Sequence, residues 1–402
     1  MCNEPPYFMM KLYLFNPESD LALANFTAHY MAPALIQRMA ADLAFLPVWY
    51  AEPGSGVVAP SAYHADYLEQ MRQLFGLRVQ LVTPPELAVL EQPQLLPWGW
   101  NPALRRRLLA HGLAESVLPS LQQLHDYRRL AGRQVSLQVL ESLTDLPNCC
   151  GEGVLLTTVD ACEAYWKRQH QRCVFKAPWS GSGKGLLWCY SDFTAAVAAW
   201  CNRVIGEQGM LVGMPLYNKV LDFAMEYRTD GRGGIDFLGY SLFDTNAKGA
   251  YSGNRLWSDL AIEQQLAAYV PLASVHGIRQ QLTESLLHFF PGYAGCMGVD
   301  MMVCRTNNDS YAVLPCVEVN LRMNMGIVAR CFYDRYVDPR SRGTFHVEAL
   351  PSTEQLVQAH RADETAAPLQ VSDGKLVSGY LSFVPITPQS RYRVYVKVHR
   401  FS

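Results

Sequence analysis

The 402-residue sequence predicts a chain of mixed α/β and α+β class. Three observations predict this class. Short apolar strands alternate with amphipathic helical segments over the first ~115 residues, as in an open parallel sheet covered by helices. A glycine-rich loop then joins two further strands. Longer apolar strands follow, two of them arranged as a hairpin, which is typical of an antiparallel sheet.

The N-terminal region contains three strand candidates and three helix candidates. Strands are expected at 11–15, 57–59 and 79–82, and helices at 34–46 and 61–77. Asn101 followed by Pro102 has the pattern of an N-cap with proline in the first helical turn, so a third helix is expected to begin there.

The rest of the chain changes its pattern twice. Residues 118–150 are helix-rich, and the order strand, helix, strand, glycine loop, strand, helix begins at Gly153. Ser191 is expected to cap the last of these helices. The strands are expected at 154–156, 173–177, 186–190, 210–212, 221–228, 235–242, 297–304, 311–322, 376–384 and 392–398. A helix is expected near 282–289, and Ser352 and Gln355 form a capping box before another.

The composition excludes several classes of protein. Half of the residues are hydrophobic, and 34 basic against 36 acidic side chains leave a formal net charge of −2. Such a chain can fill real cores, so it is not disordered or collagen-like. Binding nucleic acid through a basic surface needs clustered positive charge, which is missing. Nucleic acid is therefore not expected as a partner. A membrane is not expected either, because no uninterrupted apolar run reaches the ~18 residues of a membrane span.

The eleven cysteines are scattered and contain no C-x-x-C pair. The N-terminal residues do not follow the charged, apolar and small-residue order of a signal peptide. Reduced thiols are therefore expected. Together these features predict a cytoplasmic protein.

The glycine loop carries two of only eight lysines. Lys176 lies inside an apolar strand and Lys184 in the turn that follows. The loop is not a Walker A motif, because Pro178 stands at the first glycine position and Gly185 replaces the Ser or Thr that would hold Mg²⁺. It is not a dinucleotide fingerprint either, since Leu186 occupies the third glycine position.

A strand–loop–strand of this kind exposes backbone N–H groups that can cover phosphate oxygens. An ordinary hairpin with a Ser/Gly turn is the alternative. Lys176 favours the phosphate loop, because a buried lysine costs several kcal/mol unless an anion pairs with it.

A second group of polar residues lies on the hairpin expected at 297–322. A turn centred at Asp309 pairs residues whose numbers sum to 618, so Asp300 is expected to face Glu318. Opposed like charges destabilise a sheet, which favours a bound cation between them. A bulge at Pro315 would shift this register by one residue.

Strand periodicity places Glu318, Asn320 and Arg322 on one face. Two carboxylates and an amide oxygen suit Mg²⁺ or Mn²⁺. The alternative is a solvated outer face of an edge hairpin. The apolar residues on both strands argue for burial instead.

In their order and spacing these residues resemble the ATP-grasp superfamily. The resemblance rests on Lys176 to Gly185, on Gly298 and Asp300, and on the strand with Glu318, Asn320 and Arg322, and it covers about 118–330. It implies a pre-ATP-grasp α/β domain at 1–117 and a small ATP-grasp subdomain at 118–205. A large subdomain with the hairpin would span 206–345, and a C-terminal helix and β-hairpin at 346–402 would pack on the ATP-grasp core.

The resemblance also implies roles for single residues. Lys176 would contact the α- and β-phosphates of ATP, and Arg322 would stabilise the transferred phosphoryl group or the acyl intermediate, so these two are the expected catalytic residues. Asp300, Glu318 and Asn320 would hold two Mg²⁺ (or Mn²⁺) ions. The remaining nucleotide-binding residues would be Arg133 before the central domain, the loop Ser180, Gly181, Ser182, Gly183 and Lys184, and the adenine hinge Met210, Leu211, Val212 and Gly213.

One departure concerns the hinge. The family often carries an acidic residue there, where this chain has Gly213 and Met214, so adenine contact is expected through backbone groups.

The implied activity is that of an ADP-forming ligase, which activates a carboxylate as an acyl phosphate and joins it to an amine or thiol. The acceptor site is expected between the N-terminal domain and the carboxylate hairpin. Candidates are 16–20, otherwise a helix cap, and 251–255, otherwise an exposed turn. A small-molecule kinase and a catalytically silent ATP-binding protein are the alternatives. Small-molecule carboxylates and amines are the expected partners, and a homodimer is a reasonable assembly.

Overall fold

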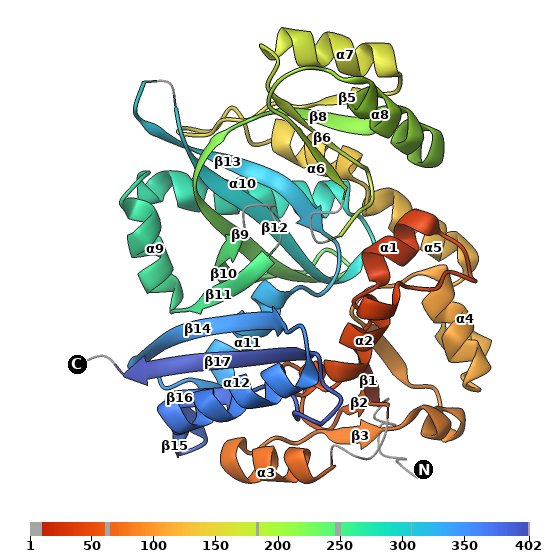
Figure 1. Ribbon diagram of the computed structural model, residues 1–402, viewed down its shortest axis with the longest axis vertical. Helices are drawn as coiled ribbons and strands as arrows, with labels where there is room; N and C mark the ends of the chain where they lie inside the picture. Colours follow the sequence, from red (N-terminus) through yellow and green to blue (C-terminus); the bar gives the residue numbers. More distant parts are fainter. Residues whose placement is uncertain (1–9, 61–64, 182–184, 246–250, 307, 401–402) are drawn as a thin grey trace, which may run out of the picture. The chain divides into compact units, whose positions relative to one another are not determined.

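The computed structural model describes residues 10–60, 65–181, 185–245, 251–306 and 308–400. By their internal contacts the residues form two units. Unit 1 contains Met1–His125 and Cys331–Ser402, and unit 2 contains Asp126–Arg330. The chain passes between them within helices α5 (Leu121–Leu130) and α11 (Met325–Tyr336). Figure 1 labels the elements of both units. Within the described residues, no helix has the length and apolar character needed to cross a membrane.

The first part of unit 1 is the expected parallel sheet. Its strands lie in the order β3-β2-β1-β4, and all the pairs are parallel. They are β1 (Lys11–Leu14), β2 (Gly56–Val58), β3 (Gln80–Val82) and β4 (Gln94–Pro97), of which β4 had no sequence prediction. The helices are α1 (Ser19–Asn25), α2 (Ala34–Asp42), α3 (Ala65–Phe75) and α4 (Pro102–Ala110). As predicted, Asn101 caps α4, accepting a 2.9 Å hydrogen bond from the Leu104 N–H.

The second part of unit 1 comes from the end of the chain. Four antiparallel strands lie in the order β14-β17-β16-β15, and helix α12 (Thr353–Ala366) lies against β16 (Figure 1). The strands are β14 (Ser341–Ala349), β15 (Gln370–Ser372), β16 (Lys375–Ser382) and β17 (Tyr392–Arg400). Ser352 caps α12 as expected.

Trp49 joins these two parts of unit 1. Its indole N–H donates a 2.8 Å hydrogen bond to the carbonyl of Phe383, and the two rings lie 5.0 Å apart. A buried indole needs both an apolar cover and an acceptor, and the C-terminal segment supplies them. The packing of 346–402 on the ATP-grasp core stays a prediction. The boundaries at 117, 205 and 345 stay predictions.

Unit 2 begins with α6 (Arg133–Glu141) and a four-stranded antiparallel sheet in the order β5-β8-β6-β7. The strands are β5 (Val154–Leu156), β6 (Cys173–Lys176), β7 (Leu186–Cys189) and β8 (Leu211–Pro215), and the helices are α7 (Val159–Arg168) and α8 (Ala195–Gln208). The prediction that Ser191 caps α8 was wrong. Thr194 caps this helix, and the carbonyl of Ser191 accepts a hydrogen bond from the Trp166 indole instead.

The larger sheet of unit 2 has the order β13-β12-β9-β10-β11, and its pairs are antiparallel. Its strands are β9 (Asn218–Asp230), β10 (Ile235–Thr245), β11 (Tyr251–Leu256), β12 (Ala294–Arg305) and β13 (Tyr311–Asn320). Helices α9 (Asp259–Ala267) and α10 (Leu272–Phe289) follow β11. One face of the sheet shares a buried apolar core with α6 and α10. The other face carries the polar residues described below.

Candidate functional site

The hairpin of β12 and β13 brings the predicted carboxylates together. Asp300 pairs directly with Glu318, as the sequence predicted. Nearer the turn, however, Met302 pairs with Leu314, so the paired numbers sum to 616 there. A bulge that contains Pro315 lies between the two registers, because proline cannot donate a ladder hydrogen bond. The predicted Asp300–Glu318 pair is confirmed, and the bulge foreseen at Pro315 occurs without displacing it.

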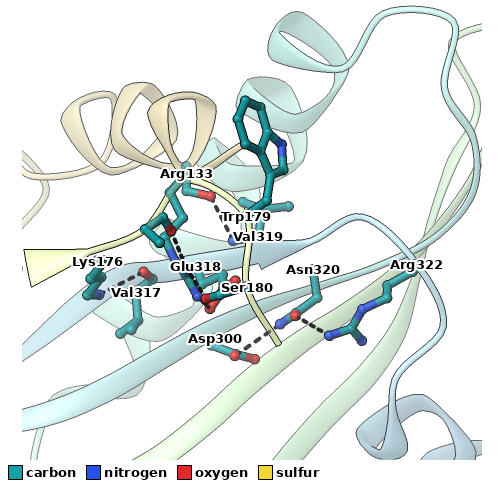
Figure 2. A network of polar contacts seen from close by, with 12 residues as sticks. Arg133, Lys176, Trp179, Ser180, Asp300, Val317, Glu318, Val319, Asn320 and Arg322 are labelled. Carbon is teal, nitrogen blue, oxygen red and sulfur yellow. Dashed lines mark hydrogen bonds and ion pairs between the residues drawn. The ribbon is translucent and has the colours of Figure 1, made fainter. Parts of the chain in front are cut away.

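Asp300, Asn320 and Arg322 form a hydrogen-bonded row (Figure 2). The amide nitrogen of Asn320 donates to the Asp300 carboxylate at 3.0 Å. The Asn320 amide oxygen accepts from the Arg322 guanidinium, also at 3.0 Å. The predicted oxygen ligands therefore share one sheet face, and protein donors occupy them.

The electrostatics at Asp300 favour a cation. Burial, followed by the neighbouring Glu318 carboxylate, raises the pKa of Asp300 to about 7. Asn320 and Arg322 act in the opposite direction. A carboxylate pair with these properties gains free energy when a divalent ion screens it.

Lys176 lies at the end of β6 and is buried, with 6% of its surface exposed. Its ammonium group donates to the backbone carbonyl of Val317 on β13 at 3.2 Å (Figure 2). Burial lowers the pKa of Lys176 to about 8, with the nearby Arg133 charge as the next cause. The lysine is therefore a desolvated cation that an anionic ligand would stabilise.

Arg133, the first residue of α6, connects the glycine loop to the carboxylate hairpin. Its guanidinium donates to the Ser180 hydroxyl at 2.7 Å and to Glu318 at 2.7 Å (Figure 2). It also donates to the carbonyl of Ala177, at the base of the loop. Gly181 follows Ser180 in the loop, whereas the predicted phosphate contacts Ser182, Gly183 and Lys184 lie outside the described residues.

The predicted adenine hinge lies in and directly before a central strand of the smaller sheet. Leu211, Val212 and Gly213 belong to β8, whose backbone pairs with both β5 and β6, and Met210 directly precedes it. The contact of these residues with adenine stays a prediction. The side chain of Val212 lines a small cavity.

That cavity lies between α6, the smaller sheet and β13. Its lining includes the two predicted phosphate-binding cations and apolar side chains, namely Arg133, Lys176, Leu137, Val212, Met214 and Val317. The cavity is small, so it shows only that these two cations and the apolar side chains face a common space.

The donor set fits a hard divalent cation. Within the part of the chain that the structure describes, no group of three or more His, Cys, Asp or Glu side chains is arranged to hold a metal ion. The predicted set instead combines two carboxylates with an amide oxygen. Mg²⁺ accepts such a set when phosphate oxygens and water complete its octahedron.

Sequence reasoning missed Glu226. This residue lies on β9 in register with Gly298, which pairs in turn with Asn320, so it shares their sheet face. It is 1% exposed, and its carboxylate accepts a 2.8 Å hydrogen bond from Asn324. The available signal was an acidic residue inside an apolar strand, the same signal that identified Lys176.

The two acceptor candidates have different local structures. In 16–20, Asn16 is buried and bonds to the carbonyl of Gly99 at 2.8 Å, Glu18 pairs with Arg107, and α1 begins at Ser19. The candidate 251–255 lies within strand β11, with Asn254 buried, so it is not an exposed turn.

No family model matches the sequence, and no curated protein matches it. Solved structures are similar in fold. N5-carboxyaminoimidazole synthetase from Staphylococcus aureus, complexed with ADP, is 9% identical with a TM-score of 0.52 over 100% of this chain and 95% of its own. Biotin carboxylase from Campylobacter jejuni, in a β-γ-ATP complex, is 12% identical with a TM-score of 0.52 over 97% of this chain and 88% of its own.

A third structure gives the same likeness. The biotin carboxylase domain of the Hydrogenobacter thermophilus 2-oxoglutarate carboxylase is 12% identical, with a TM-score of 0.52 over 97% of this chain and 86% of that one. These proteins are ATP-grasp enzymes with a pre-ATP-grasp domain. The chain therefore has the ATP-grasp fold, with an α/β domain before it.

Proposed function

We propose that the protein is an ATP- and Mg²⁺-dependent ligase that activates a carboxylate as an acyl phosphate and joins it to an amine or thiol. The observation that carries this proposal is the arrangement in unit 2. There Arg133 links the glycine-loop residue Ser180 to Glu318, beside the row of Asp300, Asn320 and Arg322 (Figure 2). The cations proposed for phosphate and the oxygens proposed for a metal thus belong to one unit.

Lys176 and Arg133 would hold the phosphate chain of ATP. Both are buried cations, and their present acceptors are two backbone carbonyls, one hydroxyl and one carboxylate. Phosphate oxygens would replace several of these acceptors and add charge complementarity in a desolvated site. Ser180 and Gly181 lead into the loop that would cover the β- and γ-phosphates.

Asp300, Glu318 and Asn320 would hold Mg²⁺. When bound, the ion neutralises the negative charge that spreads over the transferred phosphoryl group. Arg322, next to Asn320, would orient that group and stabilise the oxyanion of the acyl intermediate. No nucleophilic side chain is required.

The similar structures support the general reaction. Their descriptions include ADP, a β-γ-ATP complex, and MgADP with a bicarbonate anion. The corresponding substrates proposed for this enzyme are a small-molecule carboxylate, which accepts the phosphoryl group, and a small-molecule amine. We propose that the enzyme acts in the cytoplasm. The H. thermophilus domain is described as a dimer, which makes a homodimer the assembly to test.

The test has two stages. Isothermal titration calorimetry with Mg²⁺-ATP should show saturable binding, and its absence would reject the proposal. Amino acids and peptides, singly and in pairs, are then screened for ADP release with mass spectrometry of the products. A ligated product supports the ligase, whereas a stable phosphorylated product identifies a kinase. ADP release should also be lost in Glu318→Ala, and its persistence would contradict the site.

A further inference from the structure

Glu226 is a buried acid that the proposed mechanism does not use. It lies at the centre of the larger sheet, two residues along β9 from Ala224, which pairs with Asp300. Burial, together with the Asp300 carboxylate, raises the pKa of Glu226 to about 8 against the opposing effects of Asn324, Arg322 and Ser241. Burying the Glu226 carboxyl group costs free energy, so the residues that hydrogen-bond to it indicate its role.

Two glycines make room for the Glu226 carboxylate. A Cβ added at Gly298 would lie 2.4 Å from one carboxylate oxygen, and a Cβ added at Gly326 would lie 2.2 Å from the other. Any larger residue at either position would push the carboxylate away. The carboxylate is therefore closely fitted between β12 and the segment that follows β13.

Asn324 couples Glu226 to that segment. Its amide nitrogen donates to Glu226 at 2.8 Å, and its amide oxygen accepts from the Ile327 N–H at 2.8 Å, at the start of α11. One side chain thus fastens the beginning of the helix to the middle of the sheet. Capping bonds of this kind fix the direction in which the chain enters a helix.

Arg322 lies between two residues, Asn320 and Asn324, whose side chains are held by hydrogen bonds to the sheet. On one side Asn320 bonds to Asp300 and to the Arg322 guanidinium. On the other side Asn324 bonds to Glu226. The guanidinium also donates to the carbonyl of Met323 at 2.9 Å, so its orientation depends on the conformation of this short turn.

Glu226 also belongs to a series of hydrogen-bonded polar side chains on strands β10 and β11. Ser241 on β10 hydrogen-bonds to Glu226 and to Asn254 on β11, and Asn254 bonds in turn to Tyr251. The residues from the candidate segment 251–255 thus support the carboxylate. Their hydrogen bonds restrict its side-chain rotamer.

We propose that Glu226 is a positioning residue for Arg322: by holding Asn324 it fixes the turn that directs the Arg322 guanidinium to the γ-phosphoryl group. This inference rests on the proposed function, in which Arg322 contacts the transferred phosphoryl. It differs from a general structural role, because the effect of Glu226 is confined to the ligand group that Arg322 touches.

Calorimetry with Mg²⁺-ADP and Mg²⁺-AMP-PNP separates the two roles, because only the second nucleotide has a γ-phosphoryl group. The wild-type protein should bind AMP-PNP more tightly than ADP. Glu226→Ala should lower that preference at least fivefold, to the level of Arg322→Ala, and leave the dissociation constant for ADP within twofold. The double variant should lose no more than Arg322→Ala alone.

Two further variants sharpen the test. Glu226→Gln keeps an acceptor oxygen for Asn324 and should retain the preference. Asn324→Asp keeps the oxygen that caps α11 but loses the donor to Glu226, so it should lower the preference for AMP-PNP as Glu226→Ala does. It serves as the test if Glu226→Ala fails to fold. Equal weakening of both nucleotides, or an unchanged preference, would overturn the inference. Failure of the wild-type protein to bind either nucleotide would instead reject the proposed function with it.

Discussion

Lys176, which is buried, and Glu318, which is half-buried, show how single charges inside apolar strands define the candidate site. The sequence revealed both because each interrupts an apolar strand, where an ionised group is costly without a partner. Glu226 gives the same signal, but no second motif drew attention to it. The partner of Arg133 could not be predicted, because Glu318 lies 185 positions away and helix periodicity carries no information about such a contact.

The first prediction concerns Lys176. Replacing it with Met should stabilise the ligand-free protein at pH 7 by roughly 1–3 kcal/mol, since a desolvated charge is removed. The folded pKa of about 8 lies below the ordinary 10.5, so the wild type gains stability as the pH rises from about 8 to 10.5. The advantage of Lys176→Met should shrink over that range, as measured by urea denaturation.

Nucleotide binding should change in the opposite direction. Lys176→Met should weaken ADP binding at least tenfold, because the phosphates lose a cation. Lys167→Met, in which an exposed lysine of α7 is removed, is the matched control and should change neither quantity. A destabilised Lys176→Met protein would show that the lysine is already well paired.

A second prediction concerns Glu318. Glu318→Gln should weaken Mn²⁺ binding in the presence of ADP at least tenfold, because the amide is a poorer ligand for a hard cation. Electron paramagnetic resonance of free Mn²⁺ measures this directly. Glu207→Gln, on an exposed position of α8, should bind Mn²⁺ as the wild type does. Unchanged affinity in Glu318→Gln would place the metal elsewhere.

At the scale of elements, strand period and turn chemistry predicted most of the strands. The Asp300–Glu318 pair was predicted correctly although the hairpin contains a bulge, because the turn lies one residue earlier than assumed and the bulge restores the register. The strand expected at 210–212 is β8, but the sequence did not show which strands flank it. Its place between β5 and β6 depends on pairing that no local pattern encodes.

The third prediction concerns the base of the glycine loop. A Cβ at Gly185 would lie 2.2 Å from the Cβ of Ser180, so Gly185→Ala should force the two ends of the loop apart. ADP affinity should fall at least tenfold while the circular dichroism spectrum stays unchanged. Gly206→Ala, in α8 with no atom near the added Cβ, should keep ADP affinity and gain up to about 1 kcal/mol of stability. Equal ADP affinity in both variants would contradict a tight loop base.

At the scale of the whole molecule, the sequence predicted the fold class but not which distant segments share a unit. Trp49 and Phe383 are separated by 334 positions, yet they share one core in unit 1. Phe332 and Phe345 pack on the same phenylalanine. Contacts of this kind depend on shape complementarity between complete elements, which apolar periodicity does not specify.

The fourth prediction follows from that core. Phe383→Ala should lower the free energy of unfolding of unit 1 by about 3–5 kcal/mol, as expected for a buried aromatic residue replaced by alanine. Urea denaturation followed by tryptophan fluorescence should show the loss. Tyr190→Ala, which removes an exposed aromatic side chain, is the control and should change stability by less than about 0.5 kcal/mol. A small effect of Phe383→Ala would show that the C-terminal segment is dispensable for unit 1.

The ion pair between Arg133 and Glu318 has a consequence for how ligands enter. In the ligand-free chain a guanidinium already serves as the counter-ion of a predicted metal ligand. A free divalent ion must therefore compete with a tethered cation, whereas a metal that arrives with a nucleotide brings phosphates to which the guanidinium can transfer. We expect metal and nucleotide to enter together, in an exchange of partners in which the metal binds the Glu318 carboxylate and the phosphates bind the Arg133 guanidinium.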